Sequence, residues 1–251
     1  MEKRTDKNSY TILFATVMVI IVGSMLAFLA TYLKPQIDEN KRLEKQQNIL
    51  YALGINENDE KSVVFISTKE VAEKFSEYIV EQRVILGEGS TESEELEEAY
   101  LIDLKKEAAQ AKKGAVRRLP LFIGEKDGEK FYIVPMLGKG LWDAVWGYVA
   151  LDKDLVVEGI FFDHKGETPG LGANINQRFF MDDFKGEHIL EGDTFKGITV
   201  AKGNADPKNK RKEDFKVDAI AGATITGNGL TAMIKKDLGM YMPYLQTLKN
   251  N

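Results

Sequence analysis

The longest pattern in the chain is an uncharged apolar run from Thr11 to Leu33, TILFATVMVIIVGSMLAFLATYL. A helix of this length spans roughly 34 Å at about 1.5 Å per residue, enough for a hydrocarbon core of ~30 Å. Tyr10 and Tyr32 lie at its ends, where amphipathic aromatic side chains favour the membrane interface. The pattern predicts one transmembrane helix. A cleaved signal peptide is the alternative, but the run is long for one and its small-x-small cleavage site is poor.

Helical patterns continue after this run. Apolar residues recur among charged ones over 37–53 and Gly54 follows, which is typical of a helix that leaves the membrane and ends at a left-handed glycine. Ser67-Thr68-Lys69-Glu70 has the form of a capping box, and apolar residues at helical spacing over 71–79 predict a second helix. The acidic run 88–98 indicates a solvated loop or helix face.

From about residue 117 the apolar positions follow the two-residue period that is typical of β-strands. Arg117–Ile123 and Lys130–Met136 flank Asp127-Gly128, which is a strong hairpin signal. Val145–Leu151 and Leu155–Phe162 continue as two further strands. Because these connections are too short for crossover helices, we expect a largely antiparallel sheet.

The last part of the chain adds a helix near 176–184, a strand near 197–200 and a helix near 228–238. These elements predict an α+β fold, in which an N-terminal transmembrane helix precedes a largely antiparallel sheet with flanking helices.

Composition excludes several kinds of site. The 251 residues carry a net charge of -5, so there is no basic excess to neutralise the phosphates of a nucleic acid. The absence of cysteine excludes thiolate chemistry, disulfides and a cysteine-ligated iron–sulfur cluster in this chain. The two histidines, His164 and His188, are far apart in sequence, so we expect no histidine-rich metal site.

Three segments place small residues beside hydroxyls or aromatic rings. They are Gly138-Lys139-Gly140-Leu141-Trp142, then Gly166-Glu167-Thr168-Pro169-Gly170-Leu171-Gly172, and last Asp218-Ala219-Ile220-Ala221-Gly222-Ala223-Thr224-Ile225-Thr226.

The third segment is suited to a phosphorylated ligand. Gly222 and Ala223 let the backbone approach a ligand closely, and Thr224 offers a hydroxyl there. The helix that follows supplies free N–H groups and the positive end of its dipole. The alternative is a simple helix cap by Thr226 or Asn228 after a tight turn. The segment alone leaves both interpretations open, and it lacks the GK[ST] ending of a Walker A loop.

The other two segments have similar alternatives. Trp142 can stack on a planar ring, with Gly138 and Gly140 giving close approach, or it can be a core tryptophan after a turn. Thr168 and the amides of 170–172 can contact phosphate or ring carbonyls, or they can form an ordinary Pro-Gly turn.

Together the three segments resemble the C subunit of the sodium-translocating NADH:quinone oxidoreductases. The resemblance runs almost from end to end and includes the N-terminal span, the helix up to Gly54, GKGLWD at 138–143, GETPGLG at 166–172 and GATIT at 222–226. The last is similar to the family's flavinylation motif, [ST]-G-A-T-x-[ST]. The G subunit of the Rnf complex shares that motif and the single span, so an Rnf-type electron-transport subunit is the alternative.

The resemblance implies one FMN, joined through its phosphate to Thr224 by a separate flavin transferase. Asp218, Gly222, Ala223 and Thr226 match the recognition motif, whereas Ala221 stands where the family usually has serine or threonine. The remaining cofactor-binding residues that it implies are Gly138, Gly140, Leu141, Trp142, Glu167, Thr168, Gly170, Leu171 and Gly172.

The implied role is that of an electron-transfer subunit without complete activity of its own, in a bacterial inner-membrane complex that exports sodium. The resemblance also implies the lipid bilayer and other integral membrane and flavin or iron–sulfur subunits as partners, and a soluble domain outside the cytoplasm. We expect three parts: the tail and transmembrane helix in 1–34, a helical linker and the N-terminal part of the soluble domain in 35–113, and the FMN-binding domain in 114–251.

Two further hypotheses come from other classes. A membrane-tethered sensor domain would use the same pocket for a phosphorylated ligand without redox chemistry. A hydrolase with a threonine nucleophile is disfavoured because neither histidine lies in a recognisable triad context.

Overall fold

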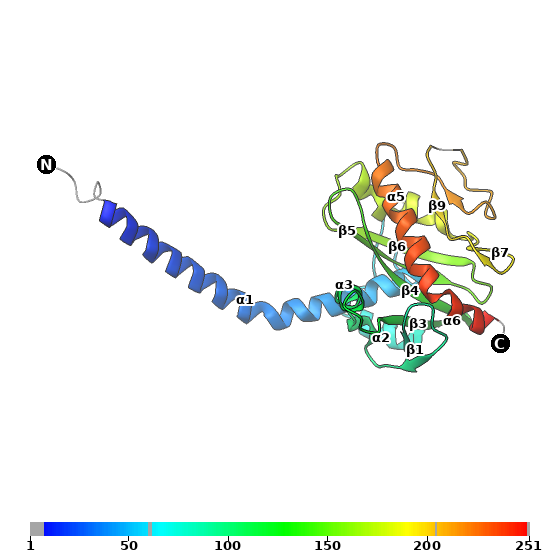
Figure 1. Ribbon diagram of the computed structural model, residues 1–251, viewed down its shortest axis with the longest axis horizontal. Coiled ribbons are helices and arrows are strands. Elements are labelled where there is room, and N and C mark those ends of the chain that lie inside the picture. Colours follow the sequence, from blue (N-terminus) through cyan, green and yellow to red (C-terminus); the bar gives the residue numbers. More distant parts are fainter. Residues whose placement is uncertain (1–7, 60–61, 204, 250–251) are drawn as a thin grey trace. The chain divides into compact units, whose positions relative to one another are not determined.

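A computed structural model describes residues 8–59, 62–203 and 205–249 (Figure 1). The chain forms two compact units, Met1–Arg42 and Leu43–Asn251. The first contains most of the long helix α1 (Asn8–Ala52), and the second contains the sheet, the remaining helices and the last turns of α1.

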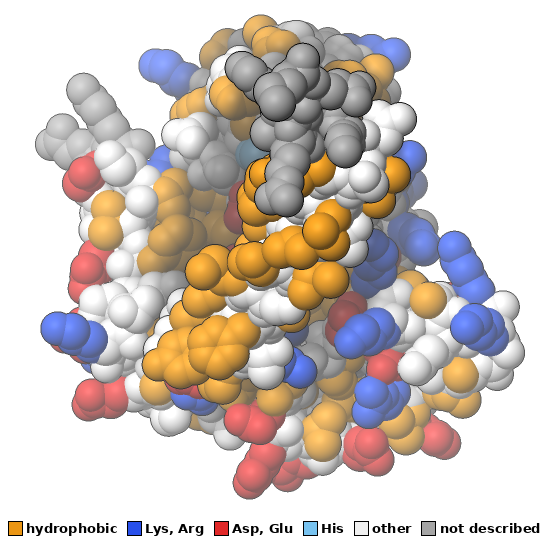
Figure 2. Space-filling view, turned by 90° about the vertical axis from the view of Figure 1, so that its left-hand side faces the viewer, with side chains coloured by type: hydrophobic (Ala, Val, Ile, Leu, Met, Phe, Trp, Pro, Cys, Tyr) orange, Lys and Arg blue, Asp and Glu red, His pale blue; other side chains and the backbone are white. Residues whose placement is uncertain are grey.

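The first unit is an apolar helix. In the described part of the chain α1 is the one helix long and apolar enough to cross a membrane, with a mean hydropathy of 2.7 over 18 residues. Hydrophobic side chains follow it in Figure 2. The hydroxyls of Thr16 and Thr31 donate to the carbonyls of Ile12 and Ala27, at 2.9 Å each, which gives both hydroxyls a partner inside the helix. The predicted apolar helix is confirmed. It continues through Pro35, so the two helices expected on either side of that residue are one.

The second unit is built on a six-stranded antiparallel sheet with the strand order β2-β1-β3-β4-β5-β6. The β3–β4 hairpin turns at Asp127 and Gly128, whose φ angles of 55° and 79° are those of the turn that the Asp-Gly pair predicts. The strands are β1 Ile79–Leu86, β2 Ser93–Glu95, β3 Arg118–Lys126, β4 Glu129–Lys139, β5 Ala144–Leu151 and β6 Val157–His164.

Helices cover both faces of this sheet. A Cβ on Gly124 of β3 would lie 2.8 Å from Leu53, which follows α1, and one on Gly138 of β4 would lie 2.7 Å from Met233. Met233 ends helix α5 (Thr224–Met233), which crosses β4 in Figure 1. Residues 131–136 of β4 are all buried, as expected for a strand packed on both sides. Two glycines therefore let the flanking helices approach the sheet closely.

The C-terminal helix is longer than expected and begins earlier. α5 is followed by a π-helical segment, η5 (Ile234–Leu238), and by α6 (Gly239–Lys249). Tyr241 of α6 is buried, and its hydroxyl donates to the carbonyl of Pro120 at 3.0 Å. The predicted start at residue 228 was wrong by four residues, which places Thr224 at the first helical position.

Smaller elements complete the unit. They are α2 (Val71–Tyr78), η2 (Ala99–Leu101), α3 (Leu104–Ala111), η3 (Gly172–Asn176), α4 (Arg178–Met181), η4 (Asp182–Phe184), β7 (Leu190–Glu191), β8 (Thr194–Phe195), β9 (Thr199–Val200) and β10 (Lys216–Val217).

Several local predictions were wrong. The helix expected over 176–184 is broken into α4 and η4, and Ile79, expected on the second helix, begins β1. The capping box does not form, because the hydroxyl of Ser67 bonds the carboxylate of Glu70 instead of a backbone amide. Leu155 lies in a turn with φ 62°, so β6 begins two residues after the predicted start. Part of the acidic run forms the edge strand β2.

Candidate functional site

A buried carboxylate joins the three glycine-bearing segments. Glu167, 4% exposed, accepts a hydrogen bond at Oε1 from the amide of Trp142 at 2.9 Å. Its Oε2 accepts from the hydroxyl of Thr226 at 2.5 Å. Trp142 lies in the loop between β4 and β5, and Thr226 lies in the first turn of α5. One side chain of the second segment thus holds the first and the third.

Glu167 is held as a carboxylate. Burial by itself would raise its pKa, but the hydroxyl of Thr226 and the amides of Trp142, Leu141 and Asp143 lower the pKa below its ordinary value. These hydrogen bonds tie the carboxylate to the Trp142 loop and to the first turn of α5. Glu167 is therefore a buried residue that connects the segments of the site.

Glycines make room for this carboxylate. A Cβ on Gly140 would lie 2.5 Å from Oε1 of Glu167. A Cβ on Gly172 would lie 2.5 Å from both Oε2 of Glu167 and Oγ1 of Thr226, within the hydrogen bond itself. The requirement for glycine at these two positions is steric.

Thr224 is exposed and occupies the first position of α5. The N–H groups of a first helical turn have no partner inside the helix, and the first turn of α5 contains no acidic residue. Gly222, just before the helix, has φ 73°, and a Cβ there would lie 2.7 Å from the side chain of Leu171. The tight turn, the free amides and the exposed hydroxyl together suit a phosphate ester.

Exposed apolar side chains come from the same segments. Trp142 is 67% exposed, and its indole N–H donates to the hydroxyl of Thr168 at 3.2 Å. Gly170 has φ 77° and open space around it, as a turn after Pro169 requires. The large apolar side chains that are exposed in these segments are Leu141, Trp142, Leu171 and Ile225. The interpretation of Trp142 as a core residue was wrong.

The simple capping alternative was also wrong. The N-cap of α5 is Ala223, which has no side chain able to cap. The hydroxyl of Thr226 is turned toward Glu167, and Asn228 lies within the helix. The first turn of α5 is supported by the rest of the fold.

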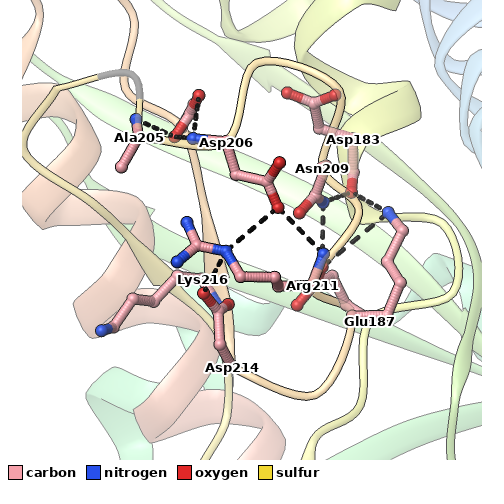
Figure 3. A network of polar contacts seen from close by, with 10 residues as sticks. Asp183, Glu187, Ala205, Asp206, Asn209, Arg211, Asp214 and Lys216 are labelled. Atoms are coloured by element: carbon pink, nitrogen blue, oxygen red, sulfur yellow. Dashed lines mark hydrogen bonds and ion pairs between the residues drawn. The ribbon is translucent and has the colours of Figure 1, made fainter.

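Asp218 supports a neighbouring loop. Its carboxylate accepts hydrogen bonds from the amides of Ala205 and Asp206 at 3.0 and 3.2 Å (Figure 3). The same loop is held from the other side by Asn209, whose amide donates to the fully buried carboxylate of Glu187 at 2.8 Å. Asp218 thus stabilises the loop at 205–206, whereas Thr226 of the same motif is bonded to Glu167.

Some residues of the site were not predicted. Gly229 brings α5 against the carbonyl of Lys139, and Met233 packs on Gly138. Nδ1 of His164 accepts a hydrogen bond from the amide of Glu167 at 3.2 Å. The Gly-Asn-Gly sequence at 227–229, at the start of the expected helix, was the available signal for the close approach at Gly229.

A hydrolytic arrangement finds no support in the described residues, since neither histidine forms a hydrogen bond with Thr224 there. His164 is engaged with the backbone of Glu167, and the backbone amide of His188 donates to the carbonyl of Lys212 at 3.0 Å.

Comparison with known proteins gives this arrangement a family. The FMN-binding domain family matches residues 140–239, which contain most of the three segments. Fold and site therefore define an FMN-binding domain on a membrane-anchored chain.

Full-length relatives identify the family more closely. The C subunit of the Na(+)-translocating NADH-quinone reductase of Pseudomonas aeruginosa is 28% identical, over 93% of this chain and 92% of its own length. The crystal structure of the corresponding protein from Parabacteroides distasonis is 31% identical, with a TM-score of 0.70 over 85% of this chain and 96% of that one. Shewanella oneidensis NqrC, at 22% identity and a TM-score of 0.68, has the same fold over 84% of this chain and 99% of its own. The chain belongs to the family formed by the C subunits of the Na(+)-translocating NADH-quinone reductases.

Proposed function

We propose that this chain carries one FMN, esterified through its phosphate to Thr224, and acts as an electron-transfer subunit of a sodium-exporting NADH:quinone oxidoreductase. The observation that most directly supports this proposal is the difference between the two hydroxyls of the motif. Thr224 is exposed at the start of α5, whereas Thr226 is 1% exposed and bonded to Glu167. One acceptor is free and the other is engaged.

The residues present fit a flavin mononucleotide. The phosphate would meet the first-turn amides of α5, beside the turn that Gly222 makes possible. The planar ring would find apolar and aromatic contacts on Leu141, Trp142 and Leu171, which are exposed without it. Bound flavin supplies the ability to accept and donate electrons singly or in pairs, and the protein supplies attachment and orientation.

Two functions of the proposed complex are assigned to other subunits, because this chain lacks the sequence features for them. Residues 11–33 contain no charged side chain, so sodium movement belongs to other integral membrane subunits. The chain has no GxGxxG sequence of the dinucleotide-binding kind, so oxidation of NADH also belongs elsewhere. Electrons would pass between this flavin and the flavin or iron–sulfur centres of the partner subunits, and a flavin transferase would attach the FMN.

The proposed location is the bacterial inner membrane, with the FMN-binding domain outside the cytoplasm. The short tail with Lys3, Arg4 and Lys7 slightly favours a cytoplasmic N-terminus. Protease added to intact spheroplasts should cleave the domain. Protection, in cells whose other periplasmic proteins are cleaved, would reverse the orientation.

Mass spectrometry of the tryptic peptide 217–235 tests the attachment directly. Full-length protein made together with a flavin transferase should yield this peptide with the added mass of FMN, and fragment ions should place that mass on Thr224. An unmodified peptide from protein whose flavin is released by denaturation would refute the covalent linkage and leave the FMN-binding fold in place.

A further inference from the structure

The start of α5 lacks the usual local means of stability. Its N-cap is Ala223, Gly222 precedes it with φ 73°, and the helix contains glycine at 227 and 229. Glycine inside a helix favours fraying, and an alanine cap leaves the first amides without a side-chain acceptor. A first turn with this composition needs support from elsewhere in the fold.

Glu167 provides that support from 59 residues away along the chain. Its Oε2 holds the hydroxyl of Thr226 in the first turn, while its Oε1 holds the amide of Trp142. Its own backbone is fixed in turn, because its amide donates to Nδ1 of His164. The carboxylate is thus a fixed point to which both the turn and the Trp142 loop are attached.

We propose that Glu167 is the positioning residue for flavin attachment: by holding Thr226 it fixes the first turn of α5 so that the hydroxyl of Thr224 is presented to the flavin transferase. This inference rests on the proposed attachment at Thr224. The same bond keeps the second hydroxyl of the motif out of reach. Hydrogen bonds to a charged acceptor are among the stronger ones in proteins, so one such bond can hold the first turn of α5 in place.

The test uses the full-length chain produced in membranes together with a flavin transferase, and it measures the initial rate of covalent labelling by in-gel flavin fluorescence. The variants are Glu167→Gln, Thr226→Val and their combination, with Thr226→Ser as the conservative replacement. Glu107→Gln is the matched control, because Glu107 is also a glutamate 4% exposed, but it pairs with Arg118 on β3.

The expected rates differ in a defined way. Glu167→Gln and Thr226→Val should each lower the labelling rate about tenfold. The double variant should be no slower than the slower single variant, because both changes break the same hydrogen bond. Thr226→Ser keeps the hydroxyl and should label within about twofold of the unchanged protein. Glu107→Gln should also label within about twofold, even where it lowers the melting temperature as much as Glu167→Gln does.

Two results would overturn the proposal: labelling of Glu167→Gln at the rate of the Glu107→Gln control, or independent effects that multiply to about a hundredfold in the double variant. If Glu167→Gln does not accumulate as folded protein, the Thr226→Ser and Thr226→Val pair decides. Equal rates for those two would exclude the hydrogen bond from any role. Absence of flavin on Thr224 of the unchanged protein would instead refute the proposed function itself.

Discussion

Replacing Gly172 by alanine should break the centre of the site. A Cβ there would lie 2.5 Å from both Oε2 of Glu167 and Oγ1 of Thr226, two atoms that are themselves 2.5 Å apart. The change therefore crowds a packed position, at about 1–3 kcal/mol, and displaces a hydrogen bond to a charged group, at about 1.5–3 kcal/mol. Alanine also restricts the unfolded chain more than glycine does, and this offsets less than about 1 kcal/mol of the loss. We expect the free energy of unfolding to fall by about 3 kcal/mol.

Thermal unfolding of the full-length protein in detergent, followed by tryptophan fluorescence, measures this loss. At about 2–4 °C per kcal/mol, Gly172→Ala should lower the melting temperature by about 6–12 °C. Gly166→Ala is the matched control, because Gly166 belongs to the same segment and a Cβ there meets nothing within 4 Å. If the two variants melt within about 2 °C of each other, the steric account of Gly172 is wrong.

Three other predictions concern the rest of the chain. Full-length protein should stay with membranes after an alkaline carbonate wash, because 11–33 carries no charge, and its release would contradict the anchor. The purified chain should show no steady turnover of NADH, and turnover in an absorbance assay would reveal a dinucleotide site. Burial raises the pKa of Glu187 to about 7, although the hydrogen bond from Asn209 acts in the opposite direction and lowers it. Between about pH 4.5 and about pH 7 the carboxyl of Glu187 keeps its proton in the folded chain and has lost it in the unfolded chain. The contribution of Glu187 to stability is therefore present below about pH 4.5 and is lost as pH rises to about 7. Glu187→Gln should therefore raise the free energy of unfolding at pH 8 by on the order of 1–3 kcal/mol, with less gain toward pH 5. Denaturant titrations that show an equal gain at both pH values would contradict this.

Short-range patterns in the sequence predicted much of the fold. The Asp127-Gly128 turn and its flanking alternation placed the central hairpin, and the uncharged run 11–33 placed the apolar helix. β1 was missed, although its sequence contains Ile79, Val80, Val84 and Ile85, because the helical face before it was extended into it. The boundary between a helix and a strand that follows without a loop has no turn residue to mark it.

The site was predicted as three segments, but the way they are joined was not. Glu167 was expected among the cofactor-binding residues, but its bonds to Trp142 and Thr226, at sequence separations of 25 and 59, were not expected. No periodic pattern encodes a contact of that range. The start of α5 was placed too late for the same reason, since the support for its first turn comes from Glu167 rather than from a local cap. Asp218 has the identity that the motif requires, but its bonds to Ala205 and Asp206 depend on a loop whose path only the fold determines.

The most direct test of the central claim compares Thr224→Ala with Thr226→Ala, each made with a flavin transferase and examined by in-gel flavin fluorescence. Thr224→Ala should lose all covalent flavin, because it removes the exposed hydroxyl at the first position of α5. Thr226→Ala should label more slowly and still carry flavin, since its acceptor remains. Fluorescence that persists in Thr224→Ala and disappears in Thr226→Ala would place the attachment two residues further along and contradict the account.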